Sequence, residues 1–313
     1  MSIPPPAPHY CVEVGPAPCT VERTLYGYYP SLGANAFFAA FFGICLLVQL
    51  VQGVRFKTWT FMIALVLGCL GEVIGYIGRL MMNHNPYDGI GFQMQICCLI
   101  LAPALVSAGI YLTLKHIVIN FGESWSRLPP VWYTRIFIAG DGLSLILQGA
   151  GGGIAATADR GSNMLDVGTN LMIAGVVLQV VVLACFGSLL TEYAVRTYRR
   201  RDQLSPEAMT LFHKTSFRCF IFALGTAYLG ILIRCVYRIP ELTGGWRSAL
   251  MRNETDFIIL EGAMIVVSVL VFTVFHPGYC FPALGNTIGK KTKRARAKNM
   301  DKASDVEMMS GHA

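Results

Sequence analysis

Charged side chains are scarce in this 313-residue chain, and long charge-free runs stand in their place. Asp, Glu, Lys and Arg make up 14% of the residues, against roughly 25% in a typical soluble domain. Apolar residues reach 54%, so a water-facing surface could not be built without exposing many apolar side chains. This composition argues against disordered and nucleic-acid-binding proteins, despite a net charge of +7. It predicts an all-α membrane protein.

Other residues are missing where particular chemistries would need them. The last apolar run, residues 257–275, contains no Lys, which a retinal-binding protein would require. All six His residues fall in tails, loops or the ends of apolar runs, so paired haem ligands or a three-ligand zinc site are not expected. No Gly-x-Ser-x-Gly nucleophile elbow occurs. We therefore expect no enzyme, no catalytic residue, no cofactor and no metal.

Seven apolar runs are each long enough for the roughly 20 residues that a helix needs to cross a bilayer. They cover approximately residues 33–53, 58–80, 89–114, 133–155, 167–191, 217–238 and 257–275. The sequence thus predicts three parts: an extracellular tail over 1–32, a seven-helix transmembrane domain over 33–281, and a basic, disordered cytosolic tail over 282–313.

The distribution of Lys and Arg predicts the orientation. Of the 25 such residues, 18 fall in the C-terminal tail and the connections after the first, third and fifth runs, and seven fall on the other side. Since cytosolic loops carry the excess of basic residues, we expect the N-terminus outside the cell and the C-terminus in the cytosol.

Two features of the expected outer side are consistent with this orientation. Cys11 and Cys19 are the only cysteines of the N-terminal tail, and in an oxidising compartment they would form a disulfide rather than remain two free thiols. Asn253 begins the only Asn-x-Thr glycosylation sequon, which falls in a predicted outside loop.

The second apolar run carries polar residues on one face of its helix. Glu72, Tyr76 and Arg79 follow one another at i, i+4 and i+7. Gly71 and Gly75 form a small-xxx-small pair beside that face, which permits another helix to approach closely. A carboxylate next to such a seam should point into the bundle, where burying it is expensive and is a functional hypothesis by default.

Further ionisable and amide side chains lie within other runs. They are Gln95, Asp141, Gln148, Arg234, Arg238, Glu241 and Glu261. With the N-terminus outside, a rise of 1.5 Å per residue puts most of them in the outer half of the membrane, with Asp141 deeper. We interpret the set as a polar, internally paired cavity for a substrate. The alternative is that the arginines only extend to the interface and that Glu72 forms a structural salt bridge.

The order and spacing of these residues resemble one known family. The elements that carry the resemblance are Tyr29-Pro30-Ser31 with Asn35, Glu72-x-x-Gly75-Tyr76-x-x-Arg79, Gln95, Leu101-Ala102-Pro103-Ala104, Tyr111, Asp141 with Gln148 and the glycines at 149 and 151–153, Arg234-x-x-x-Arg238-x-x-Glu241, and His276-Pro277-Gly278. Together they resemble the fungal lipid-translocating exporters, the RTA-like proteins named for resistance to an aminocholesterol. Glu261 is a departure, because the family is expected to have Asp there.

The resemblance implies a seven-helix membrane protein that exports amphiphiles such as sphingoid long-chain bases or sterol-like amines and confers resistance to them. We expect it in the plasma membrane, with other endomembranes as the alternative. An ammonium headgroup would need a carboxylate partner, and Glu72, Glu261 or Asp141 could provide it. Two alternatives remain open: a seven-helix receptor that senses such amphiphiles, and a porphyrin or haem transporter, since some relatives are linked to porphyrin uptake.

Overall fold

The architecture comes from a computed structural model, which describes residues 8, 10–121, 126–127, 129–157, 163–200, 206–245 and 248–280. The predicted basic tail over 282–313 lies outside these residues, as do residues 1–7 and 9 of the predicted N-terminal tail. Within the described ranges every regular element is a helix and no strand occurs.

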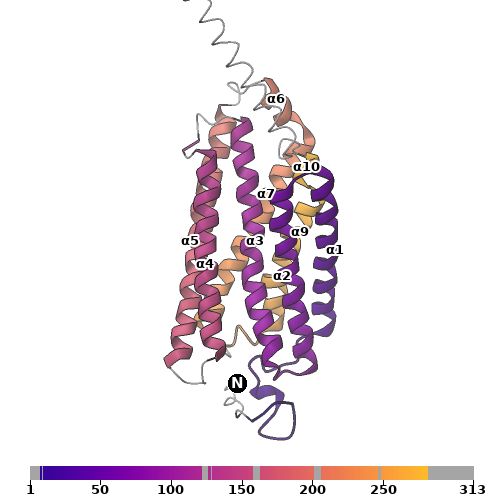
Figure 1. Cartoon of the computed structure of the whole chain (residues 1–313), viewed down its shortest axis with the longest axis vertical. Helices are drawn as coiled ribbons and strands as arrows, with labels where there is room; N and C mark the ends of the chain where they lie inside the picture. Colours follow the sequence, from indigo (N-terminus) through magenta and orange to yellow (C-terminus); the bar gives the residue numbers. More distant parts are fainter. Residues whose placement is uncertain are drawn as a thin grey trace, which may run out of the picture.

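The helices form one elongated bundle (Figure 1). In chain order they are η1 (Val21–Arg23), α1 (Leu32–Phe56), α2 (Trp59–His84), α3 (Gly89–Phe121), α4 (Pro130–Thr157), α5 (Asn163–Arg199), α6 (Pro206–His213), α7 (Thr215–Thr243), α8 (Glu254–Asp256), the π-helix η3 (Phe257–Ala263), α9 (Met264–Val274) and α10 (Pro277–Cys280). α4 and α5 pack together on one flank, α1 and α2 pack together on the other, and α3 contacts both α2 and α4.

Six helical segments in the described part of the chain are long and apolar enough to cross a membrane. They are residues 32–56, 59–84, 89–119, 163–199, 215–243 and 254–280. Large apolar side chains cover the outside of these helices, as Phe37, Leu67 and Phe222 do. The chain is therefore an integral, multi-pass membrane protein. α4 spans 28 residues but is not among the six, since Asp141, Gln148 and its glycines make it less apolar; its membrane crossing stays a prediction.

Local sequence signals set the ends of α1. The Ser31 side chain accepts a hydrogen bond from the amide of Ala34 at 3.5 Å and caps the first turn. At the other end Lys57 takes a left-handed conformation with φ of 57°, and its amide donates to the carbonyls of Gly53 and Val54. The two-residue connection that results turns the chain directly into α2.

Glycines let the paired helices approach closely. A Cβ atom added to Gly78 of α2 would lie 2.6 Å from the carbonyl oxygen of Gly91 in α3, and one added to Gly151 of α4 would lie 2.6 Å from the carbonyl oxygen of Gly168 in α5. The predicted small-residue seam on α2 therefore packs against α3, with a Cβ on Gly75 meeting the Leu99 side chain at 2.5 Å.

The α2–α3 seam should tolerate no added methyl group. We expect Gly78→Ala to destabilise the protein by about 1–3 kcal/mol, because the new Cβ would collide with backbone atoms. Gly43→Ala on α1 is the matched control, since nothing lies within 4 Å of its Cβ position and alanine favours the helix. Thermal unfolding in detergent checks this, and an equal melting temperature for the two variants would contradict it.

Candidate functional site: a buried charge network

The ten side chains predicted for the cavity are all buried, each at most 4% exposed. The structure divides them between two places. Seven belong to one network on α2, α3, α7 and η3, together with Tyr76 beside it: Glu72, Arg79, Gln95, Arg234, Arg238, Glu241 and Glu261. Asp141 and Gln148 lie on α4 and bond to α3 and α5 instead.

Glu261 is at the centre of the network. Its Oε1 atom accepts hydrogen bonds from Arg234 Nη2 at 2.6 Å and from Arg238 Nη2. Arg238 also donates to Glu241 Oε2 at 2.8 Å. Two buried guanidinium groups are thus balanced by two buried carboxylates. The alternative that Arg234 and Arg238 only extend to the membrane interface does not apply, because both side chains are at most 5% exposed.

The helix that carries Glu261 is unusual at that point. Residues Phe257–Ala263 form a π-helix between α8 and α9. In a π-helix each backbone hydrogen bond spans five residues, one more than in an α-helix. Such turns are rare and occur often at functional sites. Here the π-helix positions Glu261 opposite the two arginines of α7.

A proline links the network to α3. Pro103 lies inside α3 and has no amide hydrogen, so the carbonyl of Leu99, four residues earlier, lacks its helical partner. Arg234 Nη2 donates to that carbonyl as well as to Glu261. α3 nevertheless runs as one helix from Gly89 to Phe121, and the freed carbonyl accepts a hydrogen bond from an arginine of α7.

Arg79 lies nearer the end of the bundle that carries the N-terminal segment and is completely buried. Its Nε donates to Asn35 at 2.9 Å and its Nη2 to the Tyr28 hydroxyl at 3.3 Å. Glu254 lies 3.7 Å from Nη2, and the Phe257 ring lies 3.8 Å from the guanidinium carbon. Arg79 therefore holds together α1, α2, α8 and the segment before α1.

That segment covers the end of the bundle opposite α6 (Figure 1). Gln95 donates to the Tyr26 hydroxyl at 2.7 Å, and Asn83 donates to the carbonyl of Pro30 at 2.7 Å. Burial raises the pKa of the Tyr28 phenol, which keeps it neutral beside Arg79. Farther out, Cys11 and Cys19 are joined by a disulfide.

Glu72 differs from the other carboxylates because it has no partner. It is 1% exposed, its Oε1 accepts no hydrogen bond, and it forms no ion pair within 4.0 Å among the described residues. The neighbouring Tyr76 hydroxyl is also unpartnered. The Tyr76 ring packs on Phe38 and Phe42 of α1, with centroids 4.9 and 5.8 Å apart. The structural salt bridge that was the alternative interpretation of Glu72 is therefore absent from the described part of the chain.

The two α4 residues form separate contacts. Asp141 Oδ2 accepts from Ser107 at 2.6 Å and from the Tyr111 hydroxyl at 2.9 Å, both on α3. Gln148 donates to Gln179 of α5 at 3.1 Å. The prediction grouped these residues with Glu72, because a sequence without contacts cannot tell which neighbouring helix a face meets.

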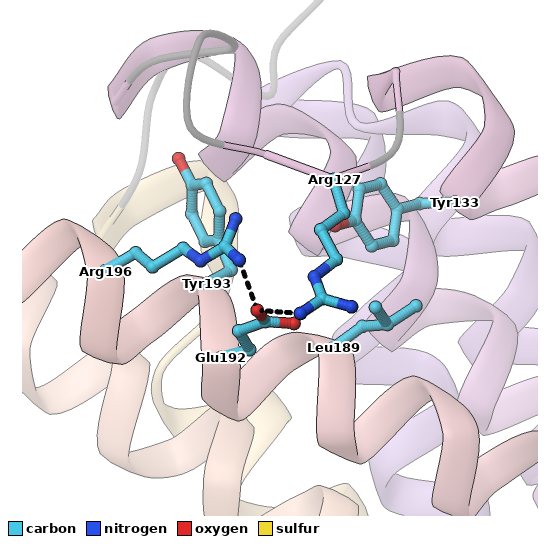
Figure 2. A pocket seen from close by; sticks show the side chains of 6 residues that line it. All are labelled: Arg127, Tyr133, Leu189, Glu192, Tyr193 and Arg196. Atoms are coloured by element: carbon cyan, nitrogen blue, oxygen red, sulfur yellow. Dashed lines mark hydrogen bonds and ion pairs between the residues drawn. The ribbon is translucent and has the colours of Figure 1, made fainter.

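A small pocket lies at the other end of the bundle, near the end of α5 (Figure 2). Arg127 and Arg196 both point at Glu192, and the Arg127 ion pair measures 2.8 Å. All three side chains are 30% exposed or more. This pocket is therefore on the surface and is not part of the buried network. Its exposed ion pairs should contribute little to stability.

Several residues that bond to the predicted site residues were not themselves predicted as site residues. Asn35, Tyr26 and Tyr28 lie before or inside the first apolar run, and Ser107 and Tyr111 lie inside the third. The sequence feature that could have identified them is a polar side chain within an apolar run, as for Asn35. Tyrosines give no such signal, because they also anchor helices at interfaces.

Comparison with known proteins now identifies the family. A family model described as RTA1 like protein matches residues 65–284, which is more than two thirds of the chain. The chain belongs to the RTA1-like family. The match covers α2 to α10 and so includes Glu72, Arg79, Asp141, Arg234, Arg238, Glu241 and Glu261.

Among the relatives of this RTA1-like protein, one is named as a transporter and another as an uptake protein. It is 30% identical to the sphingoid long-chain base transporter RSB1 of Saccharomyces cerevisiae strain YJM789, over 91% of this chain and 82% of that protein. It is 29% identical to protoporphyrin uptake protein 1 and 28% identical to protein RTM1, both of Saccharomyces cerevisiae. These two matches cover 66% and 70% of this chain, and 65% and 68% of the relatives. No solved structure matches.

Neutralising the central carboxylate should destabilise the bundle. We expect Glu261→Gln to lower the free energy of unfolding by about 3–5 kcal/mol, because two buried arginines would then share only Glu241. Glu192→Gln removes a carboxylate from two arginines at the surface and should change stability by less than about 1 kcal/mol. Thermal unfolding of both variants in detergent measures the difference, and a Glu261→Gln variant as stable as the control would refute the role.

Proposed function

We propose that this protein transports amphiphilic cations, sphingoid long-chain bases or sterol-like amines, across the membrane and thereby confers resistance to them. The proposal is of a transporter and not of an enzyme. One observation carries it: Glu72 is a buried carboxylate without a counter-ion in a network whose arginines are all paired.

The charges of the network favour a cationic ligand. Arg79 has Glu254, Arg234 has Glu261, and Arg238 has Glu241 and Glu261. Glu72 is left over, although Arg234 and Arg238 are near enough to interact with it electrostatically. An isolated carboxylate in an apolar setting is costly, and an ammonium group beside it would lower that cost.

The surroundings of Glu72 suit a lipid ammonium group. Tyr76 offers an unpartnered hydroxyl, and aromatic faces such as those of Phe38 and Phe42 attract cations. Phe37, next to Phe38, is 58% exposed on the outside of α1, where an acyl chain would lie in the bilayer. The headgroup would therefore enter between α1 and α2 while the tail stays in lipid.

The relatives support the same substrate class without fixing the substrate. RSB1 is named as a sphingoid long-chain base transporter, and a long-chain base carries the ammonium that Glu72 lacks. A porphyrin, as in the name of the uptake protein, carries carboxylates and would need an unpaired arginine. The three buried arginines already have carboxylate partners, so we favour the base.

The transport role is tested in proteoliposomes with a labelled long-chain base. Glu72→Gln should reduce its movement about tenfold or more, because a charged partner is worth roughly 2 kcal/mol. Its melting temperature should stay unchanged or rise, since Glu72 makes no ion pair within 4.0 Å in the described part of the chain. Glu192→Gln, far from the network, should transport like the wild type.

Three results would contradict parts of this proposal. If purified wild-type protein does not move the base, the transporter hypothesis fails and a receptor that senses amphiphiles becomes the better explanation. If a porphyrin is moved and the base is not, the substrate class is wrong. Full transport by Glu72→Gln would remove Glu72 from the headgroup site.

We also propose seven spans, including α4, in the plasma membrane, with the N-terminus outside and the C-terminus in the cytosol. Antibody should then reach an N-terminal epitope on intact cells and a C-terminal epitope only after permeabilisation. Asn253 is exposed at the start of α8 and would be on the outer side, so glycosidase treatment should shift the wild type and not Asn253→Gln. The reverse epitope pattern would invert the topology.

A further inference from the structure

A second unpaired carboxylate lies away from the headgroup site, on α4. Asp141 is 3% exposed, its Oδ1 accepts no hydrogen bond, and both of its hydrogen bonds end on Oδ2. No Lys or Arg interacts with it among the described residues. The headgroup mechanism does not use it.

The surroundings of Asp141 are buried and aromatic. The Tyr111 ring, whose hydroxyl bonds Asp141, packs against Phe186 of α5 at 4.5 Å and Phe137 of α4 at 5.6 Å between centroids. The titratable groups that interact with Asp141 are Tyr111 from α3 and Cys235 from α7, and α5 contributes none. Two hydroxyl groups therefore face the Asp141 carboxylate, and no cation among the described residues balances its charge.

We propose that Asp141, with Ser107 and Tyr111, is a proton-binding site that couples a transmembrane proton gradient to transport. The inference rests on the proposed transport function and goes beyond it, because it concerns the energy source. A metal cation is a poorer ligand here, since hard cations need several oxygen ligands, and one carboxylate with two hydroxyl groups is too few.

The hydrogen bonding of Ser107, on α3, depends on whether Asp141 is protonated. Its hydroxyl lies 2.6 Å from Asp141 Oδ2 and 2.8 Å from the carbonyl oxygen of Ala104, but it has a single hydrogen to donate. With Asp141 ionised, Ser107 donates to the carboxylate. With Asp141 protonated, the acid donates to Ser107 Oγ, and the Ser107 hydrogen turns to Ala104.

The hydrogen bond from Ser107 to Ala104 lies next to Pro103, whose freed carbonyl on Leu99 is bound by the charge network. Ala104 follows Pro103, and the carbonyl that Pro103 leaves free, on Leu99, accepts from Arg234 of the Glu261 network. Protonation of Asp141 therefore changes hydrogen bonding one turn from the point at which Arg234 holds α3. These contacts join the proton site to Arg234, and Arg234 interacts electrostatically with Glu72 of the headgroup site.

The test uses a trimethylammonium analogue of a long-chain base, whose fixed charge prevents it from following pH by itself. In proteoliposomes, exchange of one proton for one such cation is electroneutral, so one unit of pH difference should shift its steady-state ratio about tenfold. Asp141→Asn should still equilibrate the analogue but lose this shift. Asp166→Asn, the same change at an exposed site of α5, should keep it.

An infrared measurement tests the proton site without transport. Because Glu72 is a second unpaired buried carboxylate, the measurement is made in a Glu72→Gln background. That protein should show the carbonyl band of a protonated carboxylic acid that disappears as pH rises, and this band should be missing once Asp141→Asn is added. Asp141→Glu, which keeps a carboxyl group, should retain a titrating band if the amide variant does not fold.

The outcomes separate the two proposals. Wild-type protein that moves no analogue at all contradicts the proposed function, and the infrared band then decides the proton site alone. Transport that ignores the pH difference in the wild type, or a full pH response in Asp141→Asn, overturns the coupling. A band unchanged by Asp141→Asn overturns the proton site itself.

Discussion

Glu261 determines how the interior of this bundle can be arranged. Three arginines are buried among apolar helices, and the energy of leaving any of them unpaired would be several kcal/mol. Glu261 meets two of them with one oxygen atom, and the π-helix η3 aligns it with both. Because α7 supplies the arginines and the last span supplies the carboxylate, these two segments cannot slide without breaking the pairs. The positions of α2 and α3 against them then follow from Leu99, which Arg234 also holds.

The sequence predicted most of the fold because a bilayer limits what an apolar run can be. Six of the seven predicted spans are helices that meet the length and composition required, and each extends beyond the predicted run at one end at least. The common face of Glu72, Tyr76 and Arg79 was also predictable, since helical spacing alone determines it, and all three side chains are buried. The seam of α2 followed from Gly71 and Gly75 in the same way.

The sequence could not give the contacts between distant segments. It grouped Asp141 with Glu72, whereas Asp141 bonds Ser107 and Tyr111 on the other side of α3. Nothing in the N-terminal tail indicated that Tyr28 would reach Arg79, because that contact depends on how the chain folds back over the bundle. The π-helix was not predicted either, since the apolar run at 257–275 gives no sign of where the helical hydrogen bonding changes.

The length of α5 has a consequence for where the protein can reside. Its charge-free stretch from Val167 to Thr191 contains 25 residues and measures about 37 Å along the axis, against a hydrocarbon core of roughly 30 Å. Such a helix must tilt or thicken the lipid around it, and the mismatch costs energy for each ångström. Sterol-rich bilayers are thicker than those of the endoplasmic reticulum, so α5 would be accommodated with less strain in a sterol-rich bilayer.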